Sequence, residues 1–368
     1  MCDDAVQGRC VPDEKQLVSQ ARMVWTFSRV HQKGYSTADR DYLKAARHGV
    51  EFLRGPMKDS EHGGYFWSVT LDGKPRDPRK RLYGEAFVIY ALVEYARASG
   101  DKEALQEARG LFQLLQRKAH DARHGGWMEH FERDWSPMAI KDPNAIVEVS
   151  GYKSANSHLH LQEALAELWI DTHDPEVRAA LQESLRFNQT YFYPATPARS
   201  AFHFRPDWTP VTDPGSAGLS YGHNVEFAWL MLRAEEVLGR PQSWNHFRAH
   251  LDHAIRYGTD TVRGGLYNKG AGNKSAVDRN KVWWAQAEML AALSHAIRRW
   301  PNQGNYQEVL QKLWGWVNGP QRDAKSGICL DTVTETGQPK ATGLAHNWKA
   351  NYHDVRALLI LEEILKGR

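Results

Sequence analysis

The chain has 368 residues and a mass of 42.0 kDa, an ordinary size for one large repeat-built domain or for two smaller ones. Hydrophobic residues make up 42% of it and charged residues 25%, with 14 Trp, 14 Tyr and 12 Phe, which excludes a disordered chain. Lysine and arginine (47) nearly balance aspartate and glutamate (44). This balance argues against a nucleic acid or a membrane surface as partner and favours a small neutral molecule.

The sequence contains no stretch of about 18 apolar residues, which argues against a transmembrane helix. The first residues, MCDDAVQGRCVPDEK, lack the basic and apolar regions of a signal peptide, so we expect a cytoplasmic protein. The three cysteines, Cys2, Cys10 and Cys329, form no CxxC motif. They indicate neither a disulfide framework nor a zinc ribbon.

Apolar residues at three- and four-residue steps predict helices along most of the chain. The predicted helical pairs cover residues 14–55, 81–119, 153–191, 220–258 and 280–318, and a last helix covers 346–366. These are eleven helices. Long stretches with the alternating pattern of strands are absent from the sequence.

A short loop of glycines and aromatic residues returns between the helical pairs, as HGGYF, HGGWM, RGGLY and a degenerate SGICL. The glycines at 63, 125, 264 and 327 are 62, 139 and 63 residues apart, so we expect a diverged copy near AFHFRPDW at 201–208. A repeat of this length with two helices predicts an all-α fold, a closed (α/α)6 barrel that forms a single catalytic domain over 1–368.

Eleven helices are one fewer than the twelve of such a barrel, and the deficit lies at the front of the chain. We therefore expect that the first N-terminal helix is missing, through a misassigned start codon or through loss of the first hairpin. An in-frame helix-coding stretch upstream in the gene would test this expectation.

In a closed barrel the starts of the inner helices surround a central pocket, so polar residues there are candidates for a ligand site. The segments with such residues are ARMVWTFS at 21–28, SANSHLHLQEA at 154–164, LSYGHNVEFAWL at 219–230, KVWWAQAEML at 281–290 and HNWKANYHDVRAL at 346–358.

Two of these segments place a histidine three residues before a glutamate, on one face of a helix. Glu226 could orient His223 as an acid or base near neutral pH, or the pair could cap the helix, and both interpretations stay open. His160 and Glu163 repeat the spacing, but helical di-iron sites need glutamate before histidine, so we expect no metal. His158 and His160 diverge by about 200 degrees, so only one of them can face a given pocket.

Six motifs follow one another in the order of a known family over about nine-tenths of the chain. They are ARMVWTFS, GGYFWSVTLDG with YGEAFVIYAL, NSHLHLQEA, SYGHNVEFAWL, KVWWAQAE and WKANYHDVR. By these motifs the chain resembles the N-acylglucosamine 2-epimerase superfamily, and within it looks most like the cellobiose 2-epimerases.

The resemblance implies an (α/α)6 barrel and metal-independent inversion at C2 of an unphosphorylated reducing sugar, with no cofactor. It implies that His223 and His353 are the two acid/base groups and that Glu226 is the carboxylate beside the first of them. The substrate-binding residues that it implies are Arg22, Tyr83, Asn156, His160, Trp284 and Trp348. The same resemblance implies a homodimer.

The chemistry explains these residue types. After ring opening, removal of the C2 proton gives an enediolate, whose charge needs donors such as Arg22 and His160. Return of a proton to the opposite face needs a second base. Asn224, Asp354 and the SGICLD loop depart from the disaccharide epimerase pattern. The sugar therefore stays open between cellobiose or mannobiose, glucose or mannose, and N-acylglucosamine or N-acylmannosamine.

Three other functions compete with epimerisation. An aldose–ketose isomerase of the mannose/fructose type would use the same enediolate and reprotonate it at C1. A glycoside hydrolase would need two carboxylates where the chain has histidines, so we rank it low. A non-catalytic toroid that binds a sugar or a protein ranks low too, because His160, His223 and His353 are all present.

Overall fold

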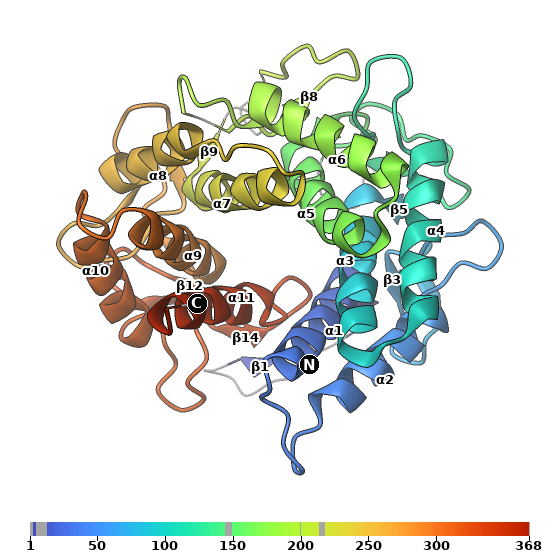
Figure 1. The fold of residues 1–368 in the computed structure, drawn as a ribbon, viewed down its shortest axis with the longest axis horizontal. Helices are drawn as coiled ribbons and strands as arrows, with labels where there is room; N and C mark the ends of the chain where they lie inside the picture. The colour runs from blue at the N-terminus through green and yellow to red at the C-terminus, as the bar shows by residue number, and fades with distance from the viewer. Residues whose placement is uncertain (1–2, 5–12, 144–148, 199, 213–217, 368) are drawn as a thin grey trace.

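The computed structural model of the chain describes residues 3–4, 13–143, 149–198, 200–212 and 218–367. Its helices form two concentric rings (Figure 1). The inner ring consists of α1 (Leu17–Gln32), α3 (Leu82–Ser99), α5 (Ala155–Thr172), α7 (Tyr221–Val237), α9 (Trp283–Arg299) and α11 (Tyr352–Leu365). The outer ring consists of α2 (Tyr42–Arg54), α4 (Lys102–Lys118), α6 (Pro175–Phe187), α8 (Trp244–Gly258) and α10 (Tyr306–Asn318). A π-helical turn, η1 (Asn188–Phe192), follows α6.

The two rings differ in how their helices are buried. The inner helix α3 is buried on every side from Leu82 to Tyr95, because it packs against inner neighbours as well as against the outer ring. Its outer partner α4 buries one stripe, which includes Ala104, Ala108 and Leu111. Asp101 caps α4 by accepting a hydrogen bond from the amide of Ala104 at 3.0 Å.

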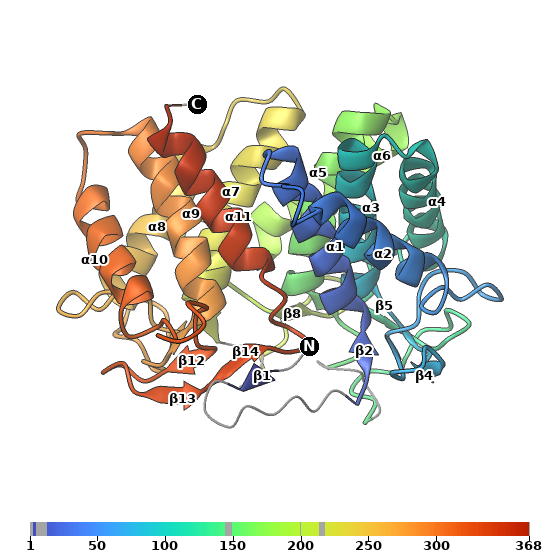
Figure 2. The same cartoon turned by 90° about the horizontal axis from the view of Figure 1, so that it is seen from below.

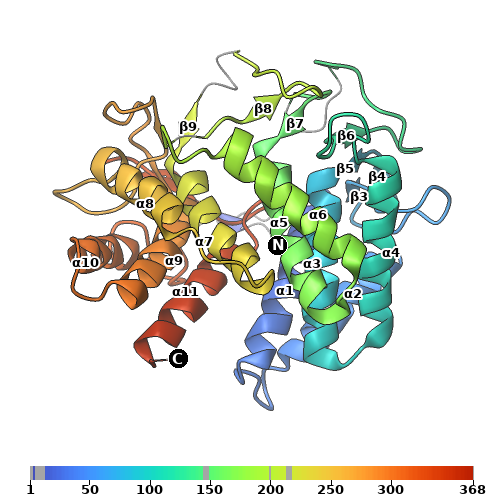
Figure 3. The same cartoon turned by 45° about the horizontal axis from the view of Figure 1, so that its top comes forward.

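Short strands gather at one end of the barrel, where the inner helices begin (Figures 2 and 3). They form six small antiparallel sheets. The sheets are β2 (Lys15–Gln16), β3 (Ser68–Val69) and β4 (Pro75–Asp77); β5 (Lys80–Arg81) and β6 (His130–Phe131); β7 (Lys153–Ser154) and β8 (His203–Phe204); β9 (Leu219–Ser220) and β10 (Lys269–Gly270); β11 (Lys281–Val282), β12 (Thr332–Val333) and β13 (Pro339–Ala341); and β1 (Asp3–Asp4) with β14 (Gly343–Ala345).

Each repeat loop is anchored to the start of a neighbouring inner helix. In four repeats the first amide of the helix donates a 2.9 Å hydrogen bond to a backbone carbonyl of the loop of the next repeat. The four pairs are Leu17 with Trp67, Leu82 with Glu129, Ala155 with Phe202, and Trp283 with Asp331. Phe202 lies in the AFHFRPDW segment, which confirms that this segment is the diverged copy of the loop.

A buried ion pair recurs at the same level of the barrel. In three repeats the lysine two residues before the start of an inner helix lies 2.9 Å from an aspartate of the glycine loop, and each lysine side chain is fully buried. The pairs are Lys80 with Asp59, Lys153 with Asp121, and Lys281 with Asp260. These ion pairs fix the N-terminal ends of three inner helices at the same level of the barrel. They thereby position the side chains in the first turns of those helices.

The predicted architecture is confirmed, with eleven α-helices in the described part of the chain. Among these residues the outer helix α2 packs against α1, but no outer helix covers α11, and Leu358 and Leu365 of α11 are 46% and 76% exposed. None of the helices combines the length and the apolar character that crossing a bilayer requires. Cys2 and Cys10 lie outside the described residues, and Cys329 is a free thiol.

The predicted start of the last helix was wrong. The helix begins at Tyr352 rather than at 346, and Asn351 before it has a left-handed backbone with φ of 53°. The segment from His346 to Lys349 instead forms a tight turn, and Lys349 donates to the carbonyl of Cys329. Trp348 therefore lies on a turn and not on a helix.

Candidate active site

A cavity of about 340 Å³ lies among the starts of the inner helices, at the strand end of the barrel. It is lined by Arg22, Arg81, Tyr83, Asn156, His160, His223, Glu226, Trp283, Trp284, His346, Trp348 and His353. All nine residues that the sequence predicted as catalytic or substrate-binding are in this set. Arg81, Trp283 and His346 were not predicted.

Arg22 from α1 supplies a fixed positive charge at the cavity. One guanidinium nitrogen donates to the hydroxyl of Tyr83 at 2.8 Å, and another donates to the carbonyl of Trp348 at 2.7 Å. Its side chain is buried, with the guanidinium carbon 4.4 Å from the ring centre of Phe87. These contacts join α1, α3 and the turn before α11, so the charge has little freedom to move.

His160 from α5 is oriented by a carboxylate one helical turn away. Its Nδ1 lies 3.0 Å from Oε2 of Glu163. Burial raises the pKa of Glu163, but the charge of Arg356 and the hydrogen bond from His160 outweigh it and lower the pKa to about 2. Because Glu163 is ionised, Nδ1 of His160 carries the hydrogen and Nε2 is the unprotonated nitrogen of the neutral ring. Burial lowers the pKa of His160 itself.

His353 from α11 is held in the same way by a different helix. Its Nδ1 lies 2.6 Å from Oε1 of Glu288 on α9. Burial lowers the pKa of His353 to about 3 despite the adjacent carboxylate. The pKa of Glu288 is lowered, since the charge of Arg356 and the bond from His353 outweigh its burial. The neutral imidazole thus has a hydrogen on Nδ1 and a free lone pair on Nε2, which suits a base.

His223 from α7 has a hydroxyl rather than a carboxylate as its neighbour. Its Nδ1 lies 2.8 Å from Oγ of Ser220, the N-cap residue that also accepts from the amide of His223. The ring centre of His223 is 4.6 Å from that of Trp284, and the ring centre of His353 is 5.8 Å from it. Both histidines therefore lie against the same indole.

Glu226 does not orient His223 in the way that the spacing suggested. Its Oε1 accepts from Arg356 at 2.7 Å and lies 3.9 Å from Nδ1 of His353, so this carboxyl group stands beside the second histidine. Burial and the charge of Glu288 raise the pKa of Glu226. The cap at His223 is supplied by Ser220 instead.

Arg356 joins the carboxylates behind the site. Its Nη2 donates to both Glu226 and Glu288 at 2.7 Å, and its Nη1 donates to Glu163. Glu226, Glu288 and His353 lie close enough together to hold a cation, but the guanidinium bonded to both carboxylates already supplies a positive charge there. This cluster is therefore a charge network built on an arginine.

Sequence reasoning missed Glu288 and Arg356, although each carries a signal. Glu288 follows Trp284 by four residues and Arg356 follows His353 by three, so each shares a helix face with a residue that was predicted. His158 has both ring nitrogens in contacts with the backbone of Ser154 and Trp127. It is the structural member of the His158 and His160 pair.

Comparisons with known proteins agree with this fold. The family model described as N-acylglucosamine 2-epimerase (GlcNAc 2-epimerase) matches residues 5–357. The cellobiose 2-epimerase of Ruminococcus albus is 32% identical, over 96% of this chain and 88% of that protein. The D-mannose isomerase of Marinomonas mediterranea is 27% identical, over 96% of this chain and 87% of that protein. The structure of the cellobiose 2-epimerase from Spirochaeta thermophila matches with a TM-score of 0.86 and 32% identity, over 99% and 90% of the two chains.

The fold and these similarities define the class of protein, an enzyme among the carbohydrate epimerases and isomerases built on an (α/α)6 barrel. The chain belongs to the N-acylglucosamine 2-epimerase family. The predicted family and class of enzyme are thereby confirmed.

Proposed function

We propose that the protein inverts the configuration at C2 of an unphosphorylated reducing sugar, with His353 and His223 as the two proton-transfer groups. The observation that carries this proposal is that both histidines, from α11 and α7, lie against Trp284 in one cavity. A flat indole suits the apolar face of a sugar. A sugar stacked there has both histidines within reach.

In the proposed reaction, Nε2 of His353 takes the C2 proton of the open-chain sugar. The electron pair of the C–H bond forms the C1–C2 double bond, and the carbonyl pair moves to O1 to give the enediolate. Arg22 stabilises the charge that develops on the oxygens, and the lone pair on Nε2 of His160 can accept a hydrogen bond from a sugar hydroxyl. The O1 electron pair then re-forms the carbonyl while the C1–C2 pair takes the proton from Nε2 of His223 on the opposite face. Proton exchange with solvent returns both histidines to their starting states, and no oxidant or cofactor is required.

The hydroxyl of Ser220 supports a donor role for His223. Its oxygen already accepts from the amide of His223, and its own hydrogen can be donated to Nδ1 of the ring. With Nδ1 as acceptor, the ring hydrogen of neutral His223 is on Nε2. The carboxylate of Glu288 imposes the opposite tautomer on His353. The two histidines are thus prepared as acid and base, and they exchange these roles in the reverse reaction.

The relatives limit the class of substrate. They are named for cellobiose and for D-mannose, and both of these sugars have an unphosphorylated aldose at the reducing end. We propose that this chain acts on such a sugar, a β-linked disaccharide of glucose or mannose or one of the monosaccharides. A cavity of about 340 Å³ has room for the reacting sugar between Trp284 and Trp348.

The direct test is product analysis with cellobiose, mannose, glucose and N-acetylglucosamine in separate incubations. Formation of the C2 epimer of at least one sugar is the expected result. A ketose as the main product would replace the proposal by the isomerase alternative. A folded protein that converts none of the four would contradict the proposal, and activity that is lost on EDTA treatment would contradict the metal-independent mechanism.

A cytoplasmic location and a homodimer remain predictions from the sequence. Cell fractionation tests the first. Sedimentation velocity of the purified protein tests the second.

A further inference from the structure

His346 lines the cavity, but the proposed reaction gives it no role. It lies in the tight turn before α11, and its side chain is 33% exposed. Its ring meets the ring of Trp283 edge to face, with 5.6 Å between the ring centres. An imidazole in such a place serves as a proton-transfer group, as a sugar ligand or as a support for a neighbouring group. The contacts of its two nitrogens decide between these roles.

One nitrogen of His346 is held by a carboxylate. Nε2 lies 2.7 Å from Oδ2 of Asp331. Burial raises the pKa of Asp331, but the hydrogen bonds from His346 and Thr332 outweigh it and lower the pKa. Asp331 is therefore ionised and can only accept, so the ring hydrogen of neutral His346 is on Nε2.

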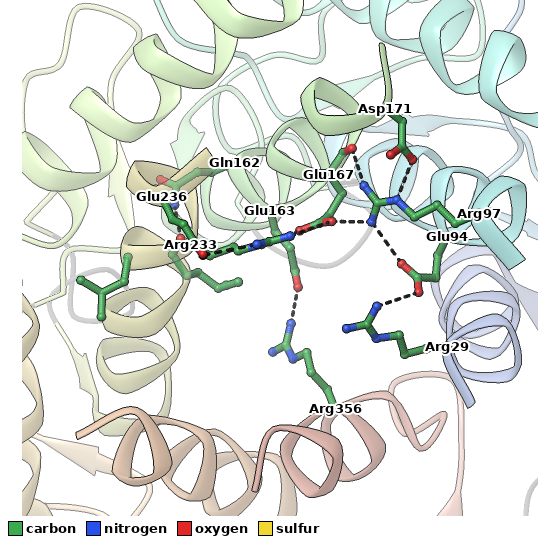
Figure 4. A network of polar contacts seen from close by, with 12 residues as sticks. Arg29, Glu94, Arg97, Gln162, Glu163, Glu167, Asp171, Arg233, Glu236 and Arg356 are labelled. Carbon is green, nitrogen blue, oxygen red and sulfur yellow. Dashed lines mark hydrogen bonds and ion pairs between the residues drawn. The ribbon is translucent and has the colours of Figure 1, made fainter. Parts of the chain in front are cut away.

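The setting of this pair differs from that of the other histidine and carboxylate pairs of the cavity. Glu163, which holds His160, is also bonded to Arg356 and belongs to a network of arginines and glutamates (Figure 4). Asp331 has no arginine partner among the described residues, and its other side-chain contact is the hydroxyl of Thr332 at 2.6 Å. A change at His346 therefore leaves the contacts of the arginine network in place.

The second nitrogen of His346 is occupied by the backbone of the same turn. The amide of Trp348 donates a hydrogen bond to Nδ1, with 3.2 Å between the two nitrogens. An amide N–H can only donate, and Nδ1 without a hydrogen can only accept, so this bond agrees with the tautomer that Asp331 imposes. Neither nitrogen has a lone pair or a hydrogen left for the sugar, which excludes His346 as a third proton-transfer group.

The bond to His346 is one of two that fix the backbone of Trp348. Its amide donates to His346, and its carbonyl accepts from Arg22 at 2.7 Å, so side chains of the cavity hold both of its peptide groups. The indole of Trp348 lines the cavity, 6.0 Å from the ring of Trp67 and 6.1 Å from that of Tyr83. Because Trp348 lies on a turn and not on a helix, the direction of its ring depends on these contacts.

We propose that His346, oriented by Asp331, is a positioning residue that holds Trp348 as a platform for the sugar. The inference rests on the proposed function, in which the sugar lies between Trp284 and Trp348. A platform contacts the sugar equally before and during proton transfer, so its displacement weakens binding and does not slow the chemical step. Loss of the acceptor at Nδ1 therefore raises KM and leaves kcat nearly unchanged.

Two variants of His346 separate the contributions of its nitrogens. His346→Asn places an amide oxygen where Nδ1 lies, so it still accepts from the amide of Trp348. His346→Gln places an amide nitrogen where Nε2 lies, so it still donates to Asp331 but offers Trp348 no acceptor. We expect His346→Gln to raise KM about fivefold or more with kcat within about twofold of wild type, and His346→Asn to restore KM.

His124→Gln is the matched control. His124 also pairs with an aspartate, Asp121, and the exposed fractions of the two side chains, 31% and 14%, are close to the 33% and 16% of His346 and Asp331. It lies outside the cavity, so its KM should equal that of the wild type. Steady-state kinetics use whichever of cellobiose, mannose, glucose and N-acetylglucosamine the wild type converts fastest.

Hydrogen–deuterium exchange at the amide of Trp348, resolved by mass spectrometry of overlapping peptides, tests the same bond without sugar. We expect faster exchange in His346→Gln and wild-type exchange in His346→Asn and His124→Gln. Wild-type exchange or a wild-type KM in His346→Gln would overturn the inference. An equal loss of kcat in both His346 variants would overturn it as well, because that loss marks a proton-transfer group.

The two measurements also separate this inference from the proposed function. If the wild type converts none of the four sugars, the proposed function fails, and the role of Trp348 as a platform fails with it. The exchange measurement then still decides whether His346 holds the turn.

Discussion

His353 and His223 differ in the group that holds Nδ1, and this difference sets their chemistry. A carboxylate beside His353 favours the imidazolium that forms when the ring accepts a proton. A hydroxyl beside His223 carries no charge and can donate as well as accept. The proposed base and the proposed acid are therefore distinguished by their neighbours and not by the residue type.

Replacing either histidine by alanine should nearly abolish turnover. We expect kcat/KM to fall by about 10²- to 10⁴-fold in His223→Ala and in His353→Ala, because each loses one proton-transfer group. His62→Ala is the control, since His62 lies in a repeat loop and does not line the cavity. Circular dichroism should show an intact fold in all three. Wild-type turnover in either cavity variant would refute the two-histidine assignment.

Glu288→Gln tests the role of the carboxylate at His353. The amide still offers an oxygen to Nδ1, but it no longer balances the charge of the protonated ring. We expect kcat to fall by about 10²-fold or more while KM changes little, because the interaction matters after proton transfer has begun. Steady-state kinetics on the identified sugar measure both constants. A raised KM with unchanged kcat would show instead that Glu288 serves binding.

The residues that the sequence proposed for this site line one cavity, but the contacts among them differ from those that the spacing suggested. Arg22, His160, His223 and His353 were predicted from motifs and helix starts, and all of them line the cavity. Glu288 was missed as a partner because its contact crosses from α9 to α11. Periodicity within one helix indicates which residues share a face, but it does not show which face of another helix they meet.

At the scale of elements, a hydrogen bond between the first turn of an inner helix and its glycine loop is repeated around the barrel. In three repeats the residue five positions after the buried lysine has a side chain that accepts a hydrogen bond. The donor is the backbone amide of the residue that follows the glycine pair of the loop. The acceptors are Glu85 for Tyr65, His158 for Trp127, and Gln286 for Leu266. Three different residue types make the same bond, which is why the pattern could not be recognised as a repeat in the sequence.

This repeated hydrogen bond predicts the effect of Glu85→Gln on stability, because Gln286 already accepts the equivalent hydrogen bond in another repeat. Burial raises the pKa of Glu85 to about 7, from an ordinary value of 4.5. A group with a raised folded-state pKa contributes stability that is complete below the unfolded pKa and is lost as pH rises through the folded pKa. The wild type should therefore lose about 3 kcal/mol relative to Glu85→Gln between pH 4.5 and pH 8.

Denaturant unfolding of both proteins at several pH values measures this difference. Glu103→Gln is the control, because it alters an exposed glutamate of α4 and should leave the pH dependence as in the wild type. A stability difference between wild type and Glu85→Gln that stays constant with pH would show that Glu85 is ionised in the folded protein throughout.

At the scale of the whole molecule, ion pairs as well as side-chain packing hold the inner ring of helices together. Arg356 on α11 bonds to carboxylates from α5, α7 and α9, so four of the six inner helices meet at one guanidinium. The repeat length predicted the closed barrel correctly. It did not predict this central network, because the network depends on residues from different repeats that meet at the axis.

Arg356→Met should destabilise the entire barrel. It leaves Glu163, Glu226 and Glu288 buried without their shared cation, a change for which we expect a loss of about 3–5 kcal/mol. Calorimetric unfolding should show a clear fall in Tm, while Arg256→Met, at an exposed position, should leave Tm nearly unchanged. An unaltered Tm in Arg356→Met would mean that the network does not contribute to the stability of the ring.

The most direct test of the central claim is proton NMR of the sugar reaction in D2O, with wild type and His353→Ala side by side. Transfer through two solvent-exchanging histidines predicts deuterium at C2 of the epimerised sugar with wild type and none with His353→Ala. Formation of the C2 epimer with its original hydrogen at C2, or deuterium uptake at the wild-type rate in His353→Ala, would contradict the account.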